Sequence, residues 1–207
     1  MSIEKAYNSW VSQYDTNENK TRDLDKKVTI KTLSNYEFES VLELGCGTGK
    51  NTEWLINRTD KIIGLDFSQG MLDHAARKIN SHKVKFKKAD LNQGWDIQNN
   101  FADLITCSLT LEHIKNLDFI FAQAYLKLKS NGKFFICELH PFKQYLGSKA
   151  KYETENGINE LEVYVHHISE YIDYATKNKF KLVELNEWFD GLIEDEIPRL
   201  ISFMFEK

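Results

Sequence analysis

Short apolar runs alternate with amphipathic stretches along most of the chain. From residue 40 onward, runs of β-branched or aliphatic residues are each followed by a stretch with helical spacing. The sequence predicts strands at 40–44, 61–66, 83–90, 102–109 and 133–139. Alternation of this kind indicates right-handed βαβ units, so we predict an α/β fold with a mostly parallel sheet and helices on both faces.

Capping residues predict where the helices begin and end. Ser68 is suited to N-cap a helix whose apolar stripe consists of Met71, Leu72, Ala75, Ala76 and Ile79. Another helix is expected to begin near Asn116 and to end before the turn at 130–132, with Gly132 as its C-cap. The helix after residue 49 carries Trp54, Leu55 and Arg58 at helical intervals.

Two segments lie outside this alternation. In residues 1–37, aromatic and apolar residues share one helical face, and Thr21 is the expected N-cap of a further helix that runs through Leu33. Residues 151–165 have strand-like residues on both sides of 155–159, which predicts a hairpin inserted after the fifth strand. A helix near 169–178 and two strands, 180–189 and 199–206, are expected to complete a single domain over 1–207.

Composition and charge narrow the class of protein. The formal net charge is −4 and the pI is about 5.9, which suits a protein that handles small molecules better than one that binds nucleic acid. The cysteines are far apart and have no metal-binding spacing, as expected of reduced thiols in the cytoplasm. No run has the length of a signal-peptide core or a membrane span, so we predict a cytoplasmic protein.

The turn after the first strand is rich in glycine. Gly45, Gly47 and Gly49 form G-x-G-x-G, a pattern that lets a ligand lie against bare backbone. A dinucleotide fingerprint has the spacing G-x-G-x-x-G/A, and Lys50 occupies the position of its last small residue. A carboxylate at Glu43 would repel a pyrophosphate but suits an ammonium group. S-adenosylmethionine (SAM), which carries an ammonium and a sulfonium and no phosphate, fits this pattern.

Two further acids end the second and third strands. Asp66 follows the glycines at about the spacing at which an acid meets ribose hydroxyls. Asp90 is placed to accept a hydrogen bond from an adenine amino group beside the backbone of Leu91, with Phe67 and Met71 against the purine. A single strand-end aspartate is more often a helix cap, but three acids in successive βα turns favour a nucleoside site.

Taken together, these features resemble those of a known protein family. Segments 41–55, 62–75, 84–91, 101–114 and 128–141 resemble the successive motifs of class I SAM-dependent methyltransferases. They are most similar to the small-molecule branch that includes ubiquinone and menaquinone biosynthesis enzymes. The resemblance covers roughly residues 38–140 and implies a Rossmann-like methyltransferase fold of about seven strands. The last strand, 199–206, would then run antiparallel to the others.

The resemblance also implies roles for matching residues and segments. Residues 1–37 would form a helical lid, 38–140 the cofactor-binding core, 141–167 a hairpin near the substrate, and 168–207 the closing helix and strands. A docked surface helix is the alternative for the lid. The implied cofactor-binding residues are Tyr14, Arg22, Glu43, Gly45, Cys46, Gly47, Gly49, Asp66, Phe67, Met71, Asp90, Leu91, Cys107 and Ser108.

The reaction expected from this class is methyl transfer from SAM, with S-adenosylhomocysteine (SAH) as the product. The acceptor is expected to be a small molecule with an oxygen, nitrogen, sulfur or carbon nucleophile. It is expected to be aromatic or heteroaromatic because the hairpin carries Tyr152 and Tyr164. His140 and His113 are hypothetical catalytic residues that contact the acceptor or take its proton; the alternative for each is a structural histidine.

Other classes and properties stay open at this point. Three competing functions are an NAD(P)-dependent oxidoreductase, a non-catalytic cofactor-binding protein and an RNA methyltransferase. The histidines have no metalloprotease-like spacing, so no metal site is expected. The oligomeric state does not follow from the sequence.

Overall fold

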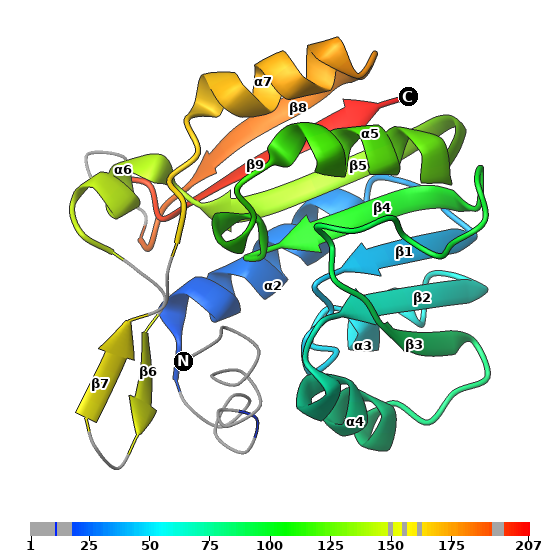
Figure 1. The fold of residues 1–207 in the computed structure, drawn as a ribbon, viewed down its shortest axis with the longest axis horizontal. Coiled ribbons are helices and arrows are strands. Elements are labelled where there is room, and N and C mark those ends of the chain that lie inside the picture. The colour runs from blue at the N-terminus through cyan, green and yellow to red at the C-terminus, as the bar shows by residue number, and fades with distance from the viewer. Residues whose placement is uncertain (1–10, 12–17, 149–150, 155–156, 161–162, 192–196) are drawn as a thin grey trace.

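A seven-stranded sheet forms the centre of the molecule, in the order β3-β2-β1-β4-β5-β9-β8 (Figure 1). The computed structural model describes residues 11, 18–148, 151–154, 157–160, 163–191 and 197–207. Its sheet strands are β1 (Ser40–Leu44), β2 (Lys61–Asp66), β3 (Val84–Lys88), β4 (Ala102–Ser108), β5 (Leu128–Leu139), β8 (Lys181–Trp188) and β9 (Leu200–Glu206). Strands β3, β2, β1, β4 and β5 are parallel, and β9 is antiparallel to both of its neighbours. This confirms the predicted fold.

Helices cover both faces of the sheet, as the sequence predicted. They are α2 (Lys20–Leu33), α3 (Thr52–Leu55), α4 (Gln69–Lys78), α5 (Leu117–Lys127), α6 (Pro141–Tyr145), α7 (Ile168–Lys177) and the 3₁₀ turn η1 (Leu111–His113). Helices α5 and α7 lie on one face and α2 on the other (Figure 1). A separate hairpin pairs β6 (Lys151–Thr154) with β7 (Gly157–Glu160), within the segment where a hairpin was expected.

The two faces are built from alternate residues of the same strands. Leu42 and Phe134 point into the cluster under α5 and α7, whereas their neighbours Val41 and Phe135 point into the cluster under α2. All four side chains are fully buried. Near-continuous apolar runs are therefore needed in the central strands, since a parallel sheet covered on both sides leaves no solvent-facing positions.

Helix boundaries test the capping predictions. Ser68 Oγ accepts a hydrogen bond from Met71 N, and Asn116 Oδ1 accepts one from Phe119 N, so both predicted N-caps are confirmed. The predicted cap Thr21 was wrong by two residues: α2 begins at Lys20, and Asn19 Oδ1 accepts from Arg22 N at 3.0 Å. Ala76 is exposed and does not belong to the buried stripe.

Gly132 is not a helix cap. Helix α5 ends at Lys127, and β5 begins at Leu128 and continues through Gly132. A Cβ atom at Gly132 would lie 2.9 Å from the carbonyl oxygen of Lys129 and 3.3 Å from that of Ala102. The glycine therefore allows close approach of backbones at the irregular start of the β4–β5 ladder, a long-range need that the local sequence does not reveal.

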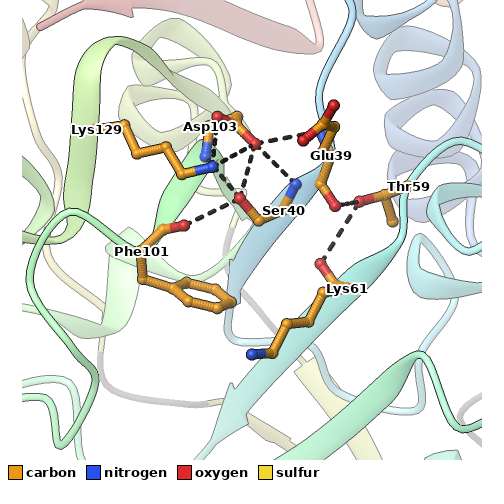
Figure 2. A network of polar contacts seen from close by, with 7 residues as sticks. All are labelled: Glu39, Ser40, Thr59, Lys61, Phe101, Asp103 and Lys129. Atoms are coloured by element: carbon orange, nitrogen blue, oxygen red, sulfur yellow. Dashed lines mark hydrogen bonds and ion pairs between the residues drawn. The ribbon is translucent and has the colours of Figure 1, made fainter.

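Asp103 connects the amino ends of β1, β4 and β5 through hydrogen bonds and an ion pair (Figure 2). Its Oδ2 accepts hydrogen bonds from Ser40 N at 2.9 Å, Ser40 Oγ at 2.7 Å and Glu39 N at 3.2 Å. Lys129 Nζ donates to the same oxygen at 3.0 Å. The carboxylate holds the amino edge of the sheet together and leaves the opposite, carboxyl edge to shape a ligand site.

Within the described ranges, no helix is both long enough and apolar enough to cross a membrane.

Candidate functional site

Two adjoining cavities lie at the carboxyl ends of β1, β2 and β4. The large cavity has a volume of about 350 Å³, and the small cavity has a volume of about 50 Å³. Both are lined by Gly45, Gly47, Ser108 and Leu109, so the turns after β1 and β4 form a shared wall. Strand order reverses at this point, because β2 pairs with one side of β1 and β4 with the other, and ligands bind at such positions in open α/β sheets.

The β1 turn depends on glycine for two different reasons. Gly45 has φ +66°, and a Cβ atom there would lie 2.1 Å from Thr110 Oγ1, so the turn touches the loop after β4. Gly47 has φ +52° and no atom within 4 Å of such a Cβ, which leaves its backbone open. Gly49 lines neither cavity. A Cβ at Gly49 would lie 2.7 Å from Ile79 Cδ1, so this glycine serves packing.

The large cavity brings together the predicted nucleoside residues. Its lining includes Asp66, Phe67, Met71, Asp90 and Leu91. Asp66 accepts hydrogen bonds from Gly47 N at 2.9 Å and Ser68 N at 2.8 Å, which join the β1 and β2 turns; burial raises the pKa of this carboxyl. Asp90 accepts from the backbone and side-chain nitrogens of Asn92, at 2.9 Å each.

The small cavity is more polar and carries charges of both signs. Glu43 is buried, and its Oε2 accepts a hydrogen bond from Thr52 Oγ1 at 2.5 Å. Burial raises the pKa of Glu43 to about 7. Arg22 and Lys50 also line the cavity, and Lys50 forms an ion pair of 2.8 Å with Asp23. The sequence placed Arg22 and Glu43 in one site, and the structure brings them to one cavity.

Several buried polar atoms in the small cavity have no hydrogen-bond partner among the described residues. They are Asp25 Oδ1, Asn51 Oδ1, Thr106 Oγ1 and Ser108 Oγ. An unpaired buried polar atom costs roughly 1–3 kcal/mol, so a group of them in one cavity indicates a polar ligand. Together with the surrounding charges, they fit the amino-acid end of SAM.

The sequence-based prediction missed three of these residues. Asp25 lies three positions after Arg22, and this spacing could have identified it, because residues at i and i+3 share a helical face. Thr106 is inside β4, and Asn51 lies in the turn before α3; neither gives a local signal. The large cavity likewise adds Lys88, Ala89, Asn92, Thr110 and Ile114 to the predicted set.

The cysteines occupy different environments. Cys46 lines the small cavity, and its backbone nitrogen donates to Leu65 O at 3.0 Å. Cys107 is fully buried in the core under α5 and α7 and lines neither cavity. Burial raises the pKa of both thiols well above the ordinary value, so the environment does not favour a reactive thiolate.

The two candidate catalytic histidines differ in position. His113, in η1, lines the large cavity, and its Nε2 lies 3.9 Å from Glu112 Oε1. His140 is fully buried and lines neither cavity. Its Nδ1 accepts from Phe142 N at 3.2 Å, and its Nε2 lies 3.0 Å from Glu187 Oε1, so both ring nitrogens are engaged in capping α6 and binding β8.

Two further observations bear on the predicted site. Tyr14 lies outside the described residues. Among the residues that the structure does describe, no three of the types His, Cys, Asp and Glu gather in a way that could hold a metal ion.

Comparison with known proteins shows a methyltransferase relationship. Residues 41–132 match a family model described as a methyltransferase domain. The ubiquinone biosynthesis O-methyltransferase of Pelagibacter ubique is 29% identical over 177 residues, which cover 82% of this chain and 71% of that protein. A demethylmenaquinone methyltransferase of Lactobacillus johnsonii is 32% identical over 120 residues, which cover 55% of this chain and 49% of that protein. Four curated relatives, the Lactobacillus johnsonii enzyme among them, are matched over only 38% to 60% of their own length.

Solved structures share the fold. A SAM-dependent methyltransferase from Listeria monocytogenes superposes with a TM-score of 0.75 at 23% identity, covering 88% of this chain and 96% of that one. A complex described as DhpI with SAM and HEP gives a TM-score of 0.75 at 18% identity, covering 100% of this chain and 99% of that one. In sequence and in fold the chain is similar to SAM-dependent methyltransferases, the class that its motifs resembled. Its sequence relatives include enzymes of ubiquinone and menaquinone biosynthesis, the branch that the motifs resembled.

Proposed function

We propose that this protein transfers a methyl group from SAM to a small-molecule acceptor. The observation that carries the proposal is the pair of joined cavities, one lined by strand-end acids and apolar residues and the other by opposite charges and unpaired polar atoms. An amino-acid nucleoside needs both environments, one for each end. A dinucleotide would instead place a pyrophosphate beside the buried Glu43.

Each end of the cofactor has candidate ligands in this chain. At the nucleoside end, Asp66 would hold the ribose and Asp90 the adenine, with Phe67, Met71 and Leu91 against the ring. At the amino-acid end, Arg22 would bind the carboxylate, because a guanidinium fork matches a carboxylate. Glu43 would bind the ammonium group, and the backbones of Gly45, Cys46 and Gly47 would form the wall between the two ends. Gly49 and Cys107 line neither cavity, so any contribution from them is indirect.

The chemistry requires alignment and the exclusion of water more than it requires acid–base catalysis. Bound SAM supplies an already activated methyl group, and the protein places the acceptor in line with it. His113 lines the large cavity beside Ile114, so we assign to it the contact with the acceptor and, where the nucleophile is protonated, the removal of its proton. His140 has no free ring nitrogen facing either cavity, which favours a positioning role for it.

The acceptor is proposed to be aromatic or heteroaromatic. The support for this proposal is the position of Tyr164, whose backbone nitrogen donates to Glu112 O at 2.7 Å, next to His113. Relatives named for demethylmenaquinone, trans-aconitate and malonyl-[acyl-carrier protein] support small or carrier-bound acceptors.

We further propose that the chain is divided into a lid (1–37), a core (38–140), a hairpin (141–167) and a closing segment (168–207). We also propose that the protein is cytoplasmic and binds no nucleic acid.

Calorimetry with SAH and with NAD tests the cofactor assignment. We expect the wild-type protein to bind SAH and not NAD, and to transfer a labelled methyl group from SAM to at least one member of an acceptor panel. Replacing Asp66 by Ala should abolish SAH binding, whereas Asp73→Ala, on the exposed face of α4, should leave it unchanged. Binding of NAD without SAH would contradict the proposal.

A further inference from the structure

Asp25 is a buried acid for which the predicted cofactor site has no role. It lies on α2, one turn before Val28, whose side chain is in the core under that helix. The residue is 5% exposed and lines the small cavity, as do Gly45 and Gly47. Its Oδ2 accepts from Asn51 Nδ2 at 3.1 Å, whereas its Oδ1 is inaccessible to solvent and lies beside Ser108 and Cys137 without a hydrogen bond of ordinary geometry.

A carboxylate in this position needs a cation. Burial raises its pKa, although Asn51, Cys137 and Ser108 beside it act in the opposite direction. Asp25 and Glu43 also act on each other, because the charge of Asp25 contributes to the raised pKa of Glu43. Lys50, which lines the cavity, forms its ion pair with Asp23 outside it, although its charge also acts to lower the pKa of Asp25. Two acids that share a small buried space hold their protons, with raised pKa values, unless a positive group lies between them and favours the ionised form.

We propose that Asp25 is a second carboxylate for the ammonium group of SAM, acting together with Glu43. The proposal rests on the SAM-dependent function proposed above. An ammonium group has three N–H donors, and the cavity offers Asp25 Oδ1 and Asn51 Oδ1 in addition to the carboxyl group of Glu43.

This assignment makes α2 part of the cofactor site. Arg22 and Asp25 are three residues apart, and both line the small cavity. One helix therefore presents a positive and a negative charge to the same space, which matches an α-amino acid in its zwitterionic form. The far end of the same helix is held in the core by Leu33. Under this proposal, bound cofactor would also hold the amino-terminal half of α2 against the turn after β1.

The test is calorimetry on the full chain with two probes. SAH carries the ammonium group, and methylthioadenosine has the same nucleoside without the amino-acid end. Asp25→Asn keeps the size of the side chain and removes its charge. We expect this variant to bind SAH about tenfold more weakly or worse, the range for losing a charged hydrogen bond, and to bind methylthioadenosine with unchanged affinity. Asp73→Asn, the same change on an exposed helix face, should alter neither affinity.

The outcomes separate the inference from the function on which it rests. If Asp25→Asn binds SAH as tightly as the wild type, the inference is overturned and the proposed function stands. If the variant loses affinity for both probes equally, Asp25 has a structural role and the inference is overturned as well. Failure of the wild-type protein to bind SAH would overturn both.

Discussion

Glu43 shows how burial sets the chemistry of a single residue. Its pKa is raised to about 7 from an ordinary value of 4.5, chiefly by burial and further by the charges of Asp25 and Asp66. The folded protein therefore binds a proton at this site more tightly than the unfolded chain does. The contribution of Glu43 to the free energy of unfolding is therefore fully present below about pH 4.5 and is lost as the pH rises through 7.

We therefore expect Glu43→Gln to flatten the pH dependence of stability. Between pH 5 and pH 8, the free energy of unfolding of the wild type should fall relative to that of the variant, by at most about 3 kcal/mol. Urea denaturation of both proteins across this range measures the difference. Parallel curves would contradict the prediction. Because SAH would favour the ionised acid, wild-type affinity for it should rise with pH over the same interval.

Gly45 and Gly47 allow a matched comparison of strain and contact. Both have positive φ, so alanine at either costs about 1–2 kcal/mol in backbone energy. Only Gly45→Ala also places a Cβ against Thr110, which adds about 1–3 kcal/mol of overpacking. We expect Gly45→Ala to lower the free energy of unfolding more than Gly47→Ala does, as measured in urea. Equal losses would show that the loop after β4 yields without cost.

At the scale of elements, Glu138 joins β5 to the turn that carries His113. Its Oε1 accepts from Thr110 N and Leu111 N, both at 3.0 Å, and burial raises its pKa to about 8. Its carboxyl group is therefore largely protonated at neutral pH and still accepts both bonds. Glu138 therefore caps the N-terminus of η1, although it lies on β5 and is far from η1 in the sequence.

Replacing Glu138 tests this cap. Glu138→Ala leaves two backbone donors without a partner, which should lower the free energy of unfolding by roughly 2 kcal/mol or more at pH 7. Glu138→Gln keeps the acceptor and resembles the protonated acid, so its stability at pH 7 should stay close to that of the wild type. Thermal and urea unfolding of the two variants provide the measurement. An equally unstable Gln variant would mean that the negative charge itself is required.

Particular elements show what the sequence could predict. The strands and the grouping of the strand-end residues at one edge followed from hydrophobic alternation and from the rule that parallel strands end together. Gly132 was misplaced because its requirement comes from backbones that meet between β4 and β5. Asn51 was missed because its partner Asp25 lies 26 residues away in the sequence and comes near it only through the packing of α2 on the sheet.

At the scale of the whole molecule, the residues that connect the strands and the residues that line the cavities lie at opposite edges of the sheet. Asp103 ties three strands together at their amino ends, whereas the cavities lie at the carboxyl ends of β1, β2 and β4. A change at one edge should therefore leave the other undisturbed, provided that the sheet itself stays intact.

Asp103→Ala tests this separation. We expect the free energy of unfolding to fall by about 1–2 kcal/mol through the lost hydrogen bonds, with unchanged affinity for SAH. Asp96→Ala, which removes an exposed ion pair with Lys87, is the matched control and should have a smaller effect on stability. Weaker SAH binding by the Asp103 variant would show that the two edges are coupled.

The position of β9 governs the order in which the sheet can come apart. This strand lies between β5 and β8, and β8, at the sheet edge, draws its ladder partners from β9. Release of β8 needs only its ladder to β9 to open, whereas release of β9 from the sheet centre needs its ladder to β5 to open. We therefore expect the amide hydrogens of β8 to exchange with solvent deuterium faster than the β9 amides that are bonded to β5. The reverse order would show that β8 and β9 leave the sheet together as a hairpin.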